Sequence, residues 1–492
     1  MKSTLRINSK TVRQTGTRWR PLSIIIFLAC MSYFFLQPEG LNTFAWRTVI
    51  IFVATIVSII CRVLPIGALG ILAITVYALT FSGGARLASE SINDALSAMN
   101  NSLIWLIVTA FMIARGFIKT GLGQRIALIL VKILGKRTLG LAYGLALADL
   151  LLAPAMPSNT ARCGGVIYPV ADSLSRSFDS FPDHDSRRKI GTFLICCIGA
   201  VNDVTSTLFL TGFTANLLAV KLAALQGVSL TWINWFTAML MPCLLSFIIT
   251  PLAVYLLVSP EIKTTPSAPL AATEQLKTMG KMTIREWGIV GTMLLLLVLW
   301  IVGAQVHVDQ TTTAFIGLSV LLLSGVLTWE DVKNEKDAWD TLIWFSALLM
   351  LASQLSKLGF TGWFGHLIAS DIGLMVRDIH WVYILIILNI IYCYLHYFFA
   401  SGNAIVAALY SVFLGVGCSL GVPALPMALM LACCTNISCS LTQYTHARGP
   451  ILFGAGYVPT GLWWRTGFIM SVINLFIFFS TGLIWWKILK LY

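Results

Sequence analysis

Long runs of apolar residues, separated by short polar segments, recur along almost the whole chain. A helix of about 20 mostly apolar residues is long enough to cross a bilayer. The pattern predicts eleven membrane-spanning helices, at residues 21–38, 46–62, 64–83, 101–117, 190–219, 231–258, 286–305, 312–328, 340–357, 425–457 and 462–486. Two more apolar stretches, 139–170 and 383–417, are each interrupted midway by a polar cluster.

The positions of the positive charges test this arrangement, because cytoplasmic loops are enriched in Lys and Arg. With a cytoplasmic N-terminus, 24 of the 33 basic residues lie on the inner side, in 1–20, 115–137, 171–189, 259–285 and 329–339, and at Arg62 and Arg465. This asymmetry holds only if 139–170 and 383–417 enter and leave the membrane on the same side. Both are therefore predicted to be re-entrant helical hairpins in an all-α polytopic membrane protein.

Composition agrees with this fold class and excludes several functions. Of the 492 residues, 58% are hydrophobic and 11% are charged, whereas soluble domains have about a quarter charged residues. The net charge of +13 is spread over short inner loops, so it does not indicate a nucleic-acid partner. The 11 cysteines lack CxxC spacing and no GxxxxGK[ST] motif occurs, so neither a metal centre nor an ATPase is predicted.

The first 20 residues are basic, with no acidic residue. They are typical of a cytoplasmic tail before a retained first helix, which favours a bacterial inner membrane. An organellar transit peptide, and hence an organellar inner membrane, is the alternative.

Short motifs recur in the two halves of the chain. Ser-Leu-Ile-Trp at 102–105 is echoed by Thr-Leu-Ile-Trp at 341–344, and a broken hairpin and a broken span follow each. With eleven crossings the second repeat starts from the opposite side, so the repeats are inverted, as in many secondary transporters. The predicted layout is a tail with three scaffold helices (1–100), a first repeat (101–258), a flexible cytoplasmic linker (259–284), two scaffold helices (285–339) and a second repeat (340–492).

The polar break in the first hairpin is the sharpest local feature. Pro157 lacks an amide hydrogen and ends a helix, and Ser158, Asn159 and Thr160 favour the start of the next. The start of a helix presents unpaired N–H groups and attracts anions, so these residues are predicted to bind carboxylates. The alternative is a purely structural turn, which is costly in hydrocarbon unless it lines a cavity.

Three other polar breaks are predicted to form the remaining walls of this site. They are the second hairpin tip and the interruptions around 211–216 and 442–450, where Gly and Pro release backbone carbonyls. A plain kink is the alternative for each broken span. The predicted site residues in these breaks are Ser401, Gly402, Asn403, Gly212, Phe213, Thr445 and His446.

Charged residues within apolar segments are usually functional or reach the membrane surface. Arg162 follows the first tip, and is predicted either to be a counter-charge for a substrate carboxylate or to extend to the cytoplasmic face. Asp149 and Asp203 either relay protons or pair with an arginine. Arg448 has no assigned role, and a satisfied buried histidine is the alternative for His446.

At these residues the chain resembles the divalent anion:sodium symporter family. It is most similar to the branch that contains citrate/succinate and tartrate/succinate antiporters and plastid 2-oxoglutarate/malate translocators. The resemblance covers almost the whole chain and is strongest at 135–138, 152–154, 157–162, 164–165 and 441–458. It implies a homodimer with an elevator-like motion, a small organic anion as substrate, and sodium as the one candidate coupling ion.

In this family Ser-Asn-Thr motifs at both tips bind the substrate carboxylates. The first tip of this chain matches in full, whereas the second keeps only Ser401. Members of the branch commonly have His at the position of Ile405, and Ala-Thr or Gly-Thr at the position of Thr445-His446. His446 is therefore a candidate to compensate for the histidine lost at Ile405.

The resulting hypothesis is a secondary transporter that exchanges di- or tricarboxylate anions. Exchange is expected because a fixed charge at Arg162 is not released with the substrate and opposes the return of an empty carrier. The alternatives are a sodium-coupled symporter, a metal-oxyanion or cation/proton exchanger, and an intramembrane enzyme. The last would need a catalytic dyad or metal cluster, and no HExxH motif is present.

Overall fold

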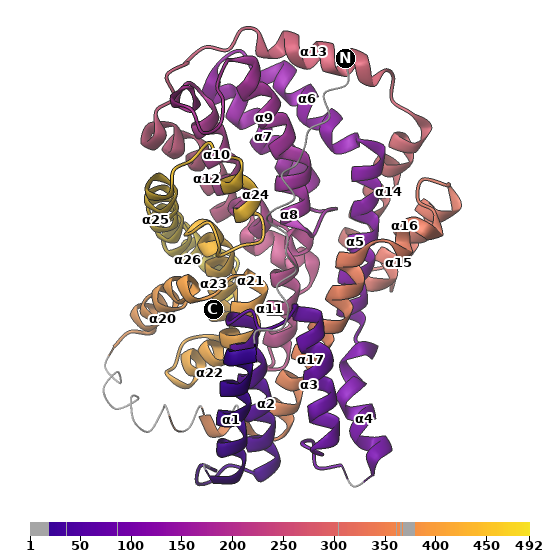
Figure 1. Ribbon diagram of the computed structural model, residues 1–492, viewed down its shortest axis with the longest axis vertical. Coiled ribbons are helices and arrows are strands. Elements are labelled where there is room, and N and C mark those ends of the chain that lie inside the picture. Colours follow the sequence, from indigo (N-terminus) through magenta and orange to yellow (C-terminus); the bar gives the residue numbers. More distant parts are fainter. Residues whose placement is uncertain are drawn as a thin grey trace. The chain divides into compact units, whose positions relative to one another are not determined.

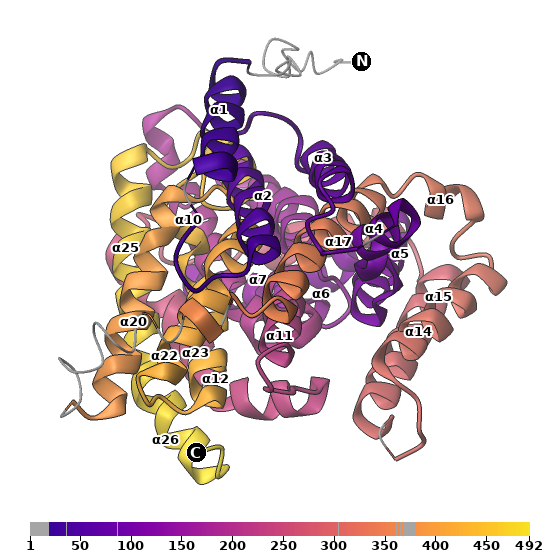
Figure 2. The ribbon, with the colours of Figure 1, turned by 90° about the horizontal axis from the view of Figure 1, so that it is seen from below.

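The structure is a computed structural model that describes residues 19–35, 37–85, 87–303, 305–360, 362–364, 367 and 379–492. The predicted cytoplasmic tail, 1–20, lies outside the described residues except for its last two. The described part is built from helices and loops, with one isolated β-bridge between Arg137 and Thr264 (Figures 1 and 2).

The described chain forms two compact units, of which the first contains residues up to Ala98 together with Ile343–Phe360. Its helices are α1 (Trp19–Phe35), α2 (Thr43–Ile60), α3 (Ile66–Leu79), α4 (Ala88–Leu96) and most of α17 (Lys336–Lys357). Helix α4 is short and polar, so the apolar pattern did not predict it. Gly70 allows α3 and α17 to pack closely, because a Cβ there would lie 3.0 Å from the Cα of Trp344.

The second unit contains Met99–Leu342 and Thr361–Tyr492. Its α-helices are α5 (Ser102–Thr120), α6 (Leu122–Leu134), α7 (Thr138–Leu152), α8 (Asn159–Arg162), α9 (Tyr168–Ser177), α10 (Gly191–Leu208), α11 (Thr214–Ala224), α12 (Trp232–Val258), α13 (Ala268–Met279), α14 (Ile284–Val302), α15 (Gln310–Leu323), α16 (Trp329–Lys333), α20 (Trp381–Leu395), α21 (Gly402–Ile405), α22 (Ser411–Ser419), α23 (Ala424–Ile437), α24 (Gly449–Gly454), α25 (Thr460–Ile477) and α26 (Leu483–Ile488). Helices α5, α14 and α15 lie side by side in both views (Figures 1 and 2).

Both predicted hairpins have the same construction. In the first, α7 leads through a turn to α8, which continues through a π-helical turn, η2 (Cys163–Ile167), into α9. In the second, α20 leads through the tip to α21, a π-helical turn, η6 (Val406–Tyr410), and α22. In Figure 1, α7 and α9 lie above α8, whereas α20 and α22 lie below α21, so the tips point in opposite directions. This is the relationship expected of inverted repeats.

The prediction of an all-α polytopic membrane protein is confirmed. In the described part, nine helices are long and apolar enough to cross a membrane, and six shorter apolar helices accompany them. Both broken spans are interrupted as predicted, between α10 and α11 and between α23 and α24. Every residue of α10 is buried, so this helix forms the core of the second unit.

The linker at 259–284 contains a helix, and the prediction that it is flexible is wrong. Helix α13 packs on α6 and buries Ala268 and Ala272. Gly280 ends the helix with a φ of +69°, a conformation that glycine adopts without strain. The Gly280 carbonyl accepts a hydrogen bond at 2.9 Å from Arg125 Nη1 of α6. The Ala-rich composition that suggested flexibility thus serves as helix-forming sequence.

Candidate functional site

The first hairpin tip caps a helix with the residues that the sequence predicted. Ser158 is the N-cap of α8, and its Oγ accepts a hydrogen bond from the Ala161 amide at 3.1 Å. The side chain of Asn159 is buried, and its Nδ2 has no hydrogen-bond partner among the described residues. Leaving a buried donor unpaired costs about 1–3 kcal/mol. The tip therefore presents a donor that is suited to an anion.

Arg162, at the end of α8, is fully buried. Its Nε donates to Asp149 Oδ1 at 3.1 Å and its Nη2 to Ser206 Oγ at 2.7 Å. Its Nη1 donates to the carbonyls of Met156 at 2.6 Å and Gly212 at 3.0 Å. Because all three nitrogens have partners inside the protein, the alternative in which Arg162 extends to the cytoplasmic face is wrong. The side chain instead ties the first tip to the first broken span.

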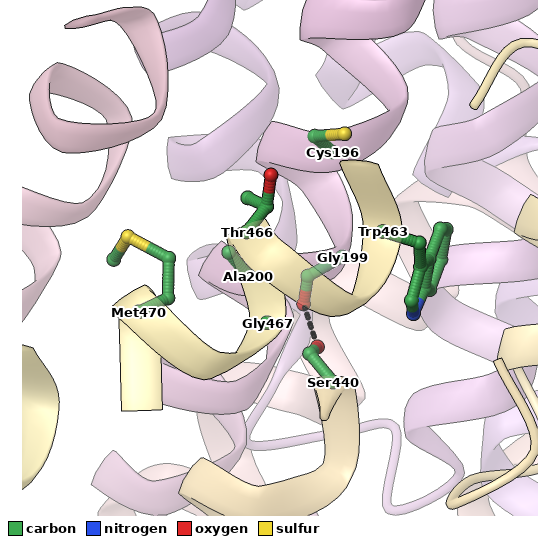
Figure 3. Close-up of a pocket in the computed structure, with 8 residues that line it drawn as sticks. All are labelled: Cys196, Gly199, Ala200, Ser440, Trp463, Thr466, Gly467 and Met470. Carbon is green, nitrogen blue, oxygen red and sulfur yellow. Dashed lines mark hydrogen bonds between the residues drawn. The ribbon is translucent and has the colours of Figure 1, made fainter. Parts of the chain in front are cut away.

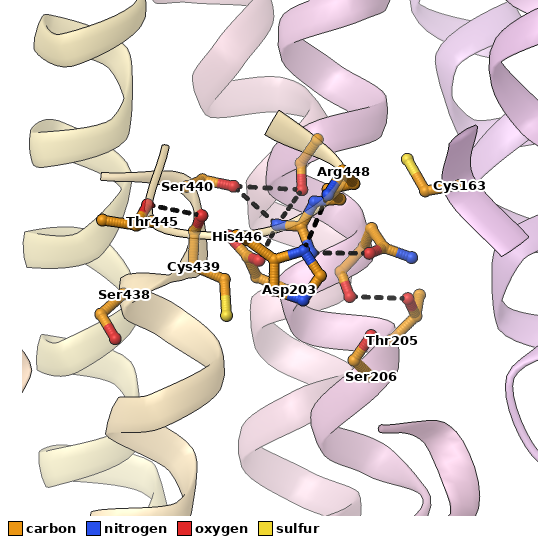
Figure 4. A network of polar contacts seen from close by, with 12 residues as sticks. Cys163, Asp203, Thr205, Ser206, Ser438, Cys439, Ser440, Thr445, His446 and Arg448 are labelled. Atoms are coloured by element: carbon orange, nitrogen blue, oxygen red, sulfur yellow. Dashed lines mark hydrogen bonds and ion pairs between the residues drawn. The ribbon is translucent and has the colours of Figure 1, made fainter. Parts of the chain in front are cut away.

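A second buried ion pair belongs to the same core (Figure 4). Arg448, in the second broken span, pairs through Nη2 with Asp203 Oδ1 of α10. The same nitrogen donates to Ser440 Oγ at 2.9 Å, and Nη1 donates to Asn202 Oδ1 at 2.8 Å. Of the two roles predicted for the buried aspartates, pairing with an arginine is confirmed.

Asn202 joins the two ion pairs. Its Nδ2 lies 3.0 Å from both carboxylate oxygens of Asp149, while its Oδ1 accepts from Arg448. Thr205 also donates to Asp149. Two arginines and two aspartates are thereby combined, so that the formal charges cancel, as burial in a low dielectric requires. The network connects the first hairpin, α10 and the second broken span.

The second tip is held by uncharged contacts. Asn403 Oδ1 accepts a hydrogen bond at 3.0 Å from Thr214 Oγ1, at the start of α11. Gly402 lies against Phe213, because a Cβ there would be only 2.9 Å from two carbons of the ring. Ser401 is the N-cap of α21, but its side chain makes no capping hydrogen bond. The first broken span and the second tip are therefore in direct contact.

The two predicted residues of the second broken span have different surroundings. The His446 ring packs edge-on against Phe213, with centroids 5.3 Å apart. Thr445 is fully buried, and its Oγ1 lies 3.0 Å from the carbonyls of both Cys439 and Thr442. The Thr445 hydroxyl therefore shapes the loop itself, and the predicted residue that faces the other breaks is His446.

Several residues of this core were not predicted from the sequence. His396 precedes the second tip, and its ring nitrogens lie 2.5 Å from Ser438 Oγ and 3.1 Å from the Thr445 carbonyl. A single histidine in an apolar segment gave no signal of this role. Asn202 and Ser206 belong to a run of polar residues within apolar α10, and such a run is a signal that could have identified them.

A small cavity lies beside the network, between α10 and α25 (Figure 3). Its volume is about 20 Å³, and its lining consists of Cys196, Gly199, Ala200, Ser440, Trp463, Thr466, Gly467 and Met470. A cavity of this size holds about one water molecule. It is therefore too small to receive a dicarboxylate.

The segment Gly417–Gly421 has the GxSxG spacing of a hydrolase nucleophile, which sits at a turn from a strand to a helix. Here Ser419 ends a helix, α22, and its hydroxyl donates to the Val416 carbonyl at 2.9 Å. Since neither the turn nor a free hydroxyl is present at Ser419, the spacing does not indicate an enzyme.

Comparison with known proteins agrees with this architecture. Residues 16–492 match the family described as the sodium:sulfate symporter transmembrane region. YflS of Bacillus subtilis (strain 168), whose assignment to malate transport is provisional, is 47% identical over 98% of each chain. The chloroplastic dicarboxylate transporter 2 of Spinacia oleracea is 43% identical, over 97% of this chain and 84% of its own. The L-tartrate/succinate antiporter of Escherichia coli (strain K12) is 34% identical, over 96% of this chain and 99% of its own.

Two solved structures share the fold. MtrF of Neisseria gonorrhoeae, an antimetabolite efflux pump, aligns with a TM-score of 0.59 over 94% of this chain and 97% of its own, at 13% identity. The YdaH transporter of Alcanivorax borkumensis aligns with a TM-score of 0.55 over 80% of this chain and 86% of its own, also at 13% identity. The family resemblance seen in the sequence is confirmed, and the chain belongs to the sodium:sulfate symporter family of membrane transporters.

Proposed function

We propose that this protein exchanges di- and tricarboxylate anions across a bacterial inner membrane. The observation that carries the proposal is the unpaired Nδ2 donor of Asn159, buried beside Ser158. A substrate carboxylate would accept a hydrogen bond from this amide and from the Ser158 hydroxyl, whose oxygen already accepts from Ala161. The names of the relatives agree, since they refer to malate, to dicarboxylates, and to L-tartrate with succinate.

The two tips together suit an elongated dianion. In the first, the helix that starts at Asn159 directs its positive end and first-turn amides, including that of Thr160, towards the anion. In the second, Ser401 has a hydroxyl that is not used for capping, and Asn403 holds the tip to α11 through Thr214. One carboxylate at each tip would leave the middle of the substrate near the broken spans.

Exchange is supported over sodium-coupled symport by the partners of Arg162. Hard cations are bound by oxygen ligands such as backbone carbonyls. The carbonyls of Met156 and Gly212, released at the first tip and first break, already accept from Arg162 at 2.6 and 3.0 Å. A cation that belongs to the chain cannot leave with the substrate. Asp149 neutralises Arg162, so the site does not carry the fixed net charge that the sequence suggested. Exchange is favoured instead because Arg162 already occupies the carbonyls that a sodium ion would need.

The family resemblance also suggests a homodimer with an elevator-like movement. In this proposal the helices of 1–100 and 285–339 form the scaffold, and the two repeats carry the substrate. The network from Arg162 to Arg448 supports this division, because it ties a hairpin, a buried helix and a broken span into one block.

The test is uptake of labelled succinate and malate into proteoliposomes. Exchange predicts uptake only into vesicles loaded with a dicarboxylate, at a rate that is independent of the sodium gradient. Sodium-driven uptake into empty vesicles would establish the symporter instead. A metal-oxyanion or cation exchanger predicts that succinate, malate and citrate do not raise the unfolding temperature of the purified protein.

A further inference from the structure

His446 occupies the point where three of the four breaks meet. It belongs to the second broken span, and its ring packs edge-on against Phe213 of the first, with centroids 5.3 Å apart. Phe213 in turn lies against Gly402 of the second tip. The carbonyl of the residue before Phe213, Gly212, binds Arg162 beside the first tip. These contacts form a chain that links the two tips, and His446 touches this chain at Phe213.

The hydrogen bond made by Nδ1 determines the tautomer of His446. This nitrogen accepts from the Arg448 amide at 3.1 Å, so it carries no proton (Figure 4). The imidazole is therefore neutral and its proton is on Nε2. Arg448 is itself held by Asp203 and Asn202, so the orientation of the ring is fixed by the buried network.

The Nε2–H group of His446 has no acceptor within the described part of the chain. The neighbouring buried histidine differs, because both ring nitrogens of His396 have partners, Ser438 Oγ and the Thr445 carbonyl. His446 is only 4% exposed. Its Nε2 is nevertheless absent from the fully buried polar atoms that lack a partner, among which Asn159 Nδ2 is found, so this N–H faces space that water or a ligand can reach. It is therefore a donor that is available to a bound substrate.

We infer that His446 Nε2–H donates a hydrogen bond to an oxygen on the carbon chain of the substrate, between the two carboxylates. The inference rests on the proposed function, in which the carboxylates are bound by the tips. The neutral Nε2–H donor of His446 matches a neutral acceptor on the substrate, namely a hydroxyl or keto oxygen at C2 of the dicarboxylate. The site therefore prefers 2-hydroxy and 2-oxo dicarboxylates over unsubstituted ones, and His446 is the residue that discriminates between them.

The experiment measures the apparent KM of exchange for malate, 2-oxoglutarate and succinate in proteoliposomes. The wild-type protein is expected to favour malate over succinate by about tenfold, the factor that one hydrogen bond to an uncharged group supplies. His446→Leu should raise the KM for malate and 2-oxoglutarate by about the same factor and leave that for succinate within about twofold. His446→Gln, which keeps an N–H donor, should restore part of the preference. His307→Gln, at an exposed histidine, is the matched control.

Each outcome has a defined meaning. A wild-type protein that transports succinate as well as malate overturns the inference, even if the variants do not fold. A loss in His446→Leu that is equal for all three acids also overturns it and shows a structural role only. Failure of the wild-type protein to exchange any dicarboxylate would instead contradict the proposed function, and the two failures are therefore distinguishable.

Discussion

Arg448 and Asp203 form a buried ion pair although 245 residues separate them in the sequence. One belongs to the second broken span and the other to α10. Through Asn202 this pair is joined to a second pair, Arg162 with Asp149, so that both halves of the chain share one charge-neutral network. The consequences for stability, substrate preference and pH can each be measured.

Removing one partner of the Arg448–Asp203 pair leaves a buried charge without a counter-charge. Arg448→Met is therefore expected to lower the free energy of unfolding by about 3–5 kcal/mol. Combining it with Asp203→Leu should recover part of this loss, because the second charge is then removed as well. Denaturant unfolding of the purified protein in detergent measures Arg448→Met, Asp203→Leu and the double variant, and strictly additive losses would contradict the coupling.

An exposed ion pair provides the control for that experiment. Arg176 and Asp172 are paired at 2.9 Å on α9, and the Arg176 side chain is 50% exposed. Such pairs contribute only about 0–1 kcal/mol. Arg176→Gln should accordingly change the free energy of unfolding far less than Arg448→Met.

Asn403→Thr is expected to alter substrate preference, because it introduces at the second tip the last residue of the Ser-Asn-Thr motif that the family resemblance implies. The shorter hydroxyl also weakens the contact with Thr214, which now donates to Asn403 Oδ1 at 3.0 Å. Counter-transport with a panel of C4 to C6 acids is the measurement. Identical uptake of every acid before and after the substitution would argue against a role of Asn403 at the substrate.

The Lys119–Asp331 pair links the last turn of α5 to α16, a short helix that is not one of the candidate membrane spans. Burial acts to raise the pKa of Asp331, but hydrogen bonds from Lys119 and Thr328 outweigh it and lower the pKa to about 2. The unfolded value is about 3.9. A depressed pKa stabilises the fold above the unfolded value, and the contribution is lost as the pH falls towards 2.

The variant Asp331→Asn tests whether the ionised Asp331 carboxylate stabilises the fold above its unfolded pKa. At pH 7 it should lower the free energy of unfolding by up to about 1 kcal/mol, the scale of a partly exposed pair. The difference from the wild-type protein should shrink as the pH falls from about 4 to 2. A difference that stays constant over this range would show that the carboxylate charge is not responsible.

The features of the fold and site that the sequence predicted depend on residues that are close together in the chain. Pro157 and Ser158 define the first tip through backbone rules that act within a few residues, so the helix start at Asn159 was predictable. The spans and hairpins followed from apolar length and loop charge, which are also local properties. The substrate-binding roles of the tips were predicted from the same residues and stay predictions.

Hydrogen-bond partners that are distant in the chain could not be predicted from the sequence in this way. Nothing near Arg162 in the sequence indicates that Ser206 and Gly212 hold its guanidinium, 44 and 50 residues away. Asn202 stands in a polar run that marks this part of α10, but nothing near it in the sequence indicates that its amide joins the two ion pairs. The helix α13 was missed because Ala, Thr, Glu and Lys occur both in helices and in flexible segments.

The most direct test of the account is exchange of labelled succinate by Asn159→Ala in proteoliposomes matched to the wild type. Nδ2 of Asn159 has no partner among the described residues, so removing it should leave the unfolding temperature almost unchanged. Asn334→Ala, at the C-cap of α16 and outside both hairpins and both broken spans, is the control and should exchange normally. The account predicts that Asn159→Ala folds and inserts but raises the KM for succinate by about tenfold or more, as does Ser158→Ala. Unchanged KM values in both variants would contradict the assignment of the first tip as the carboxylate site.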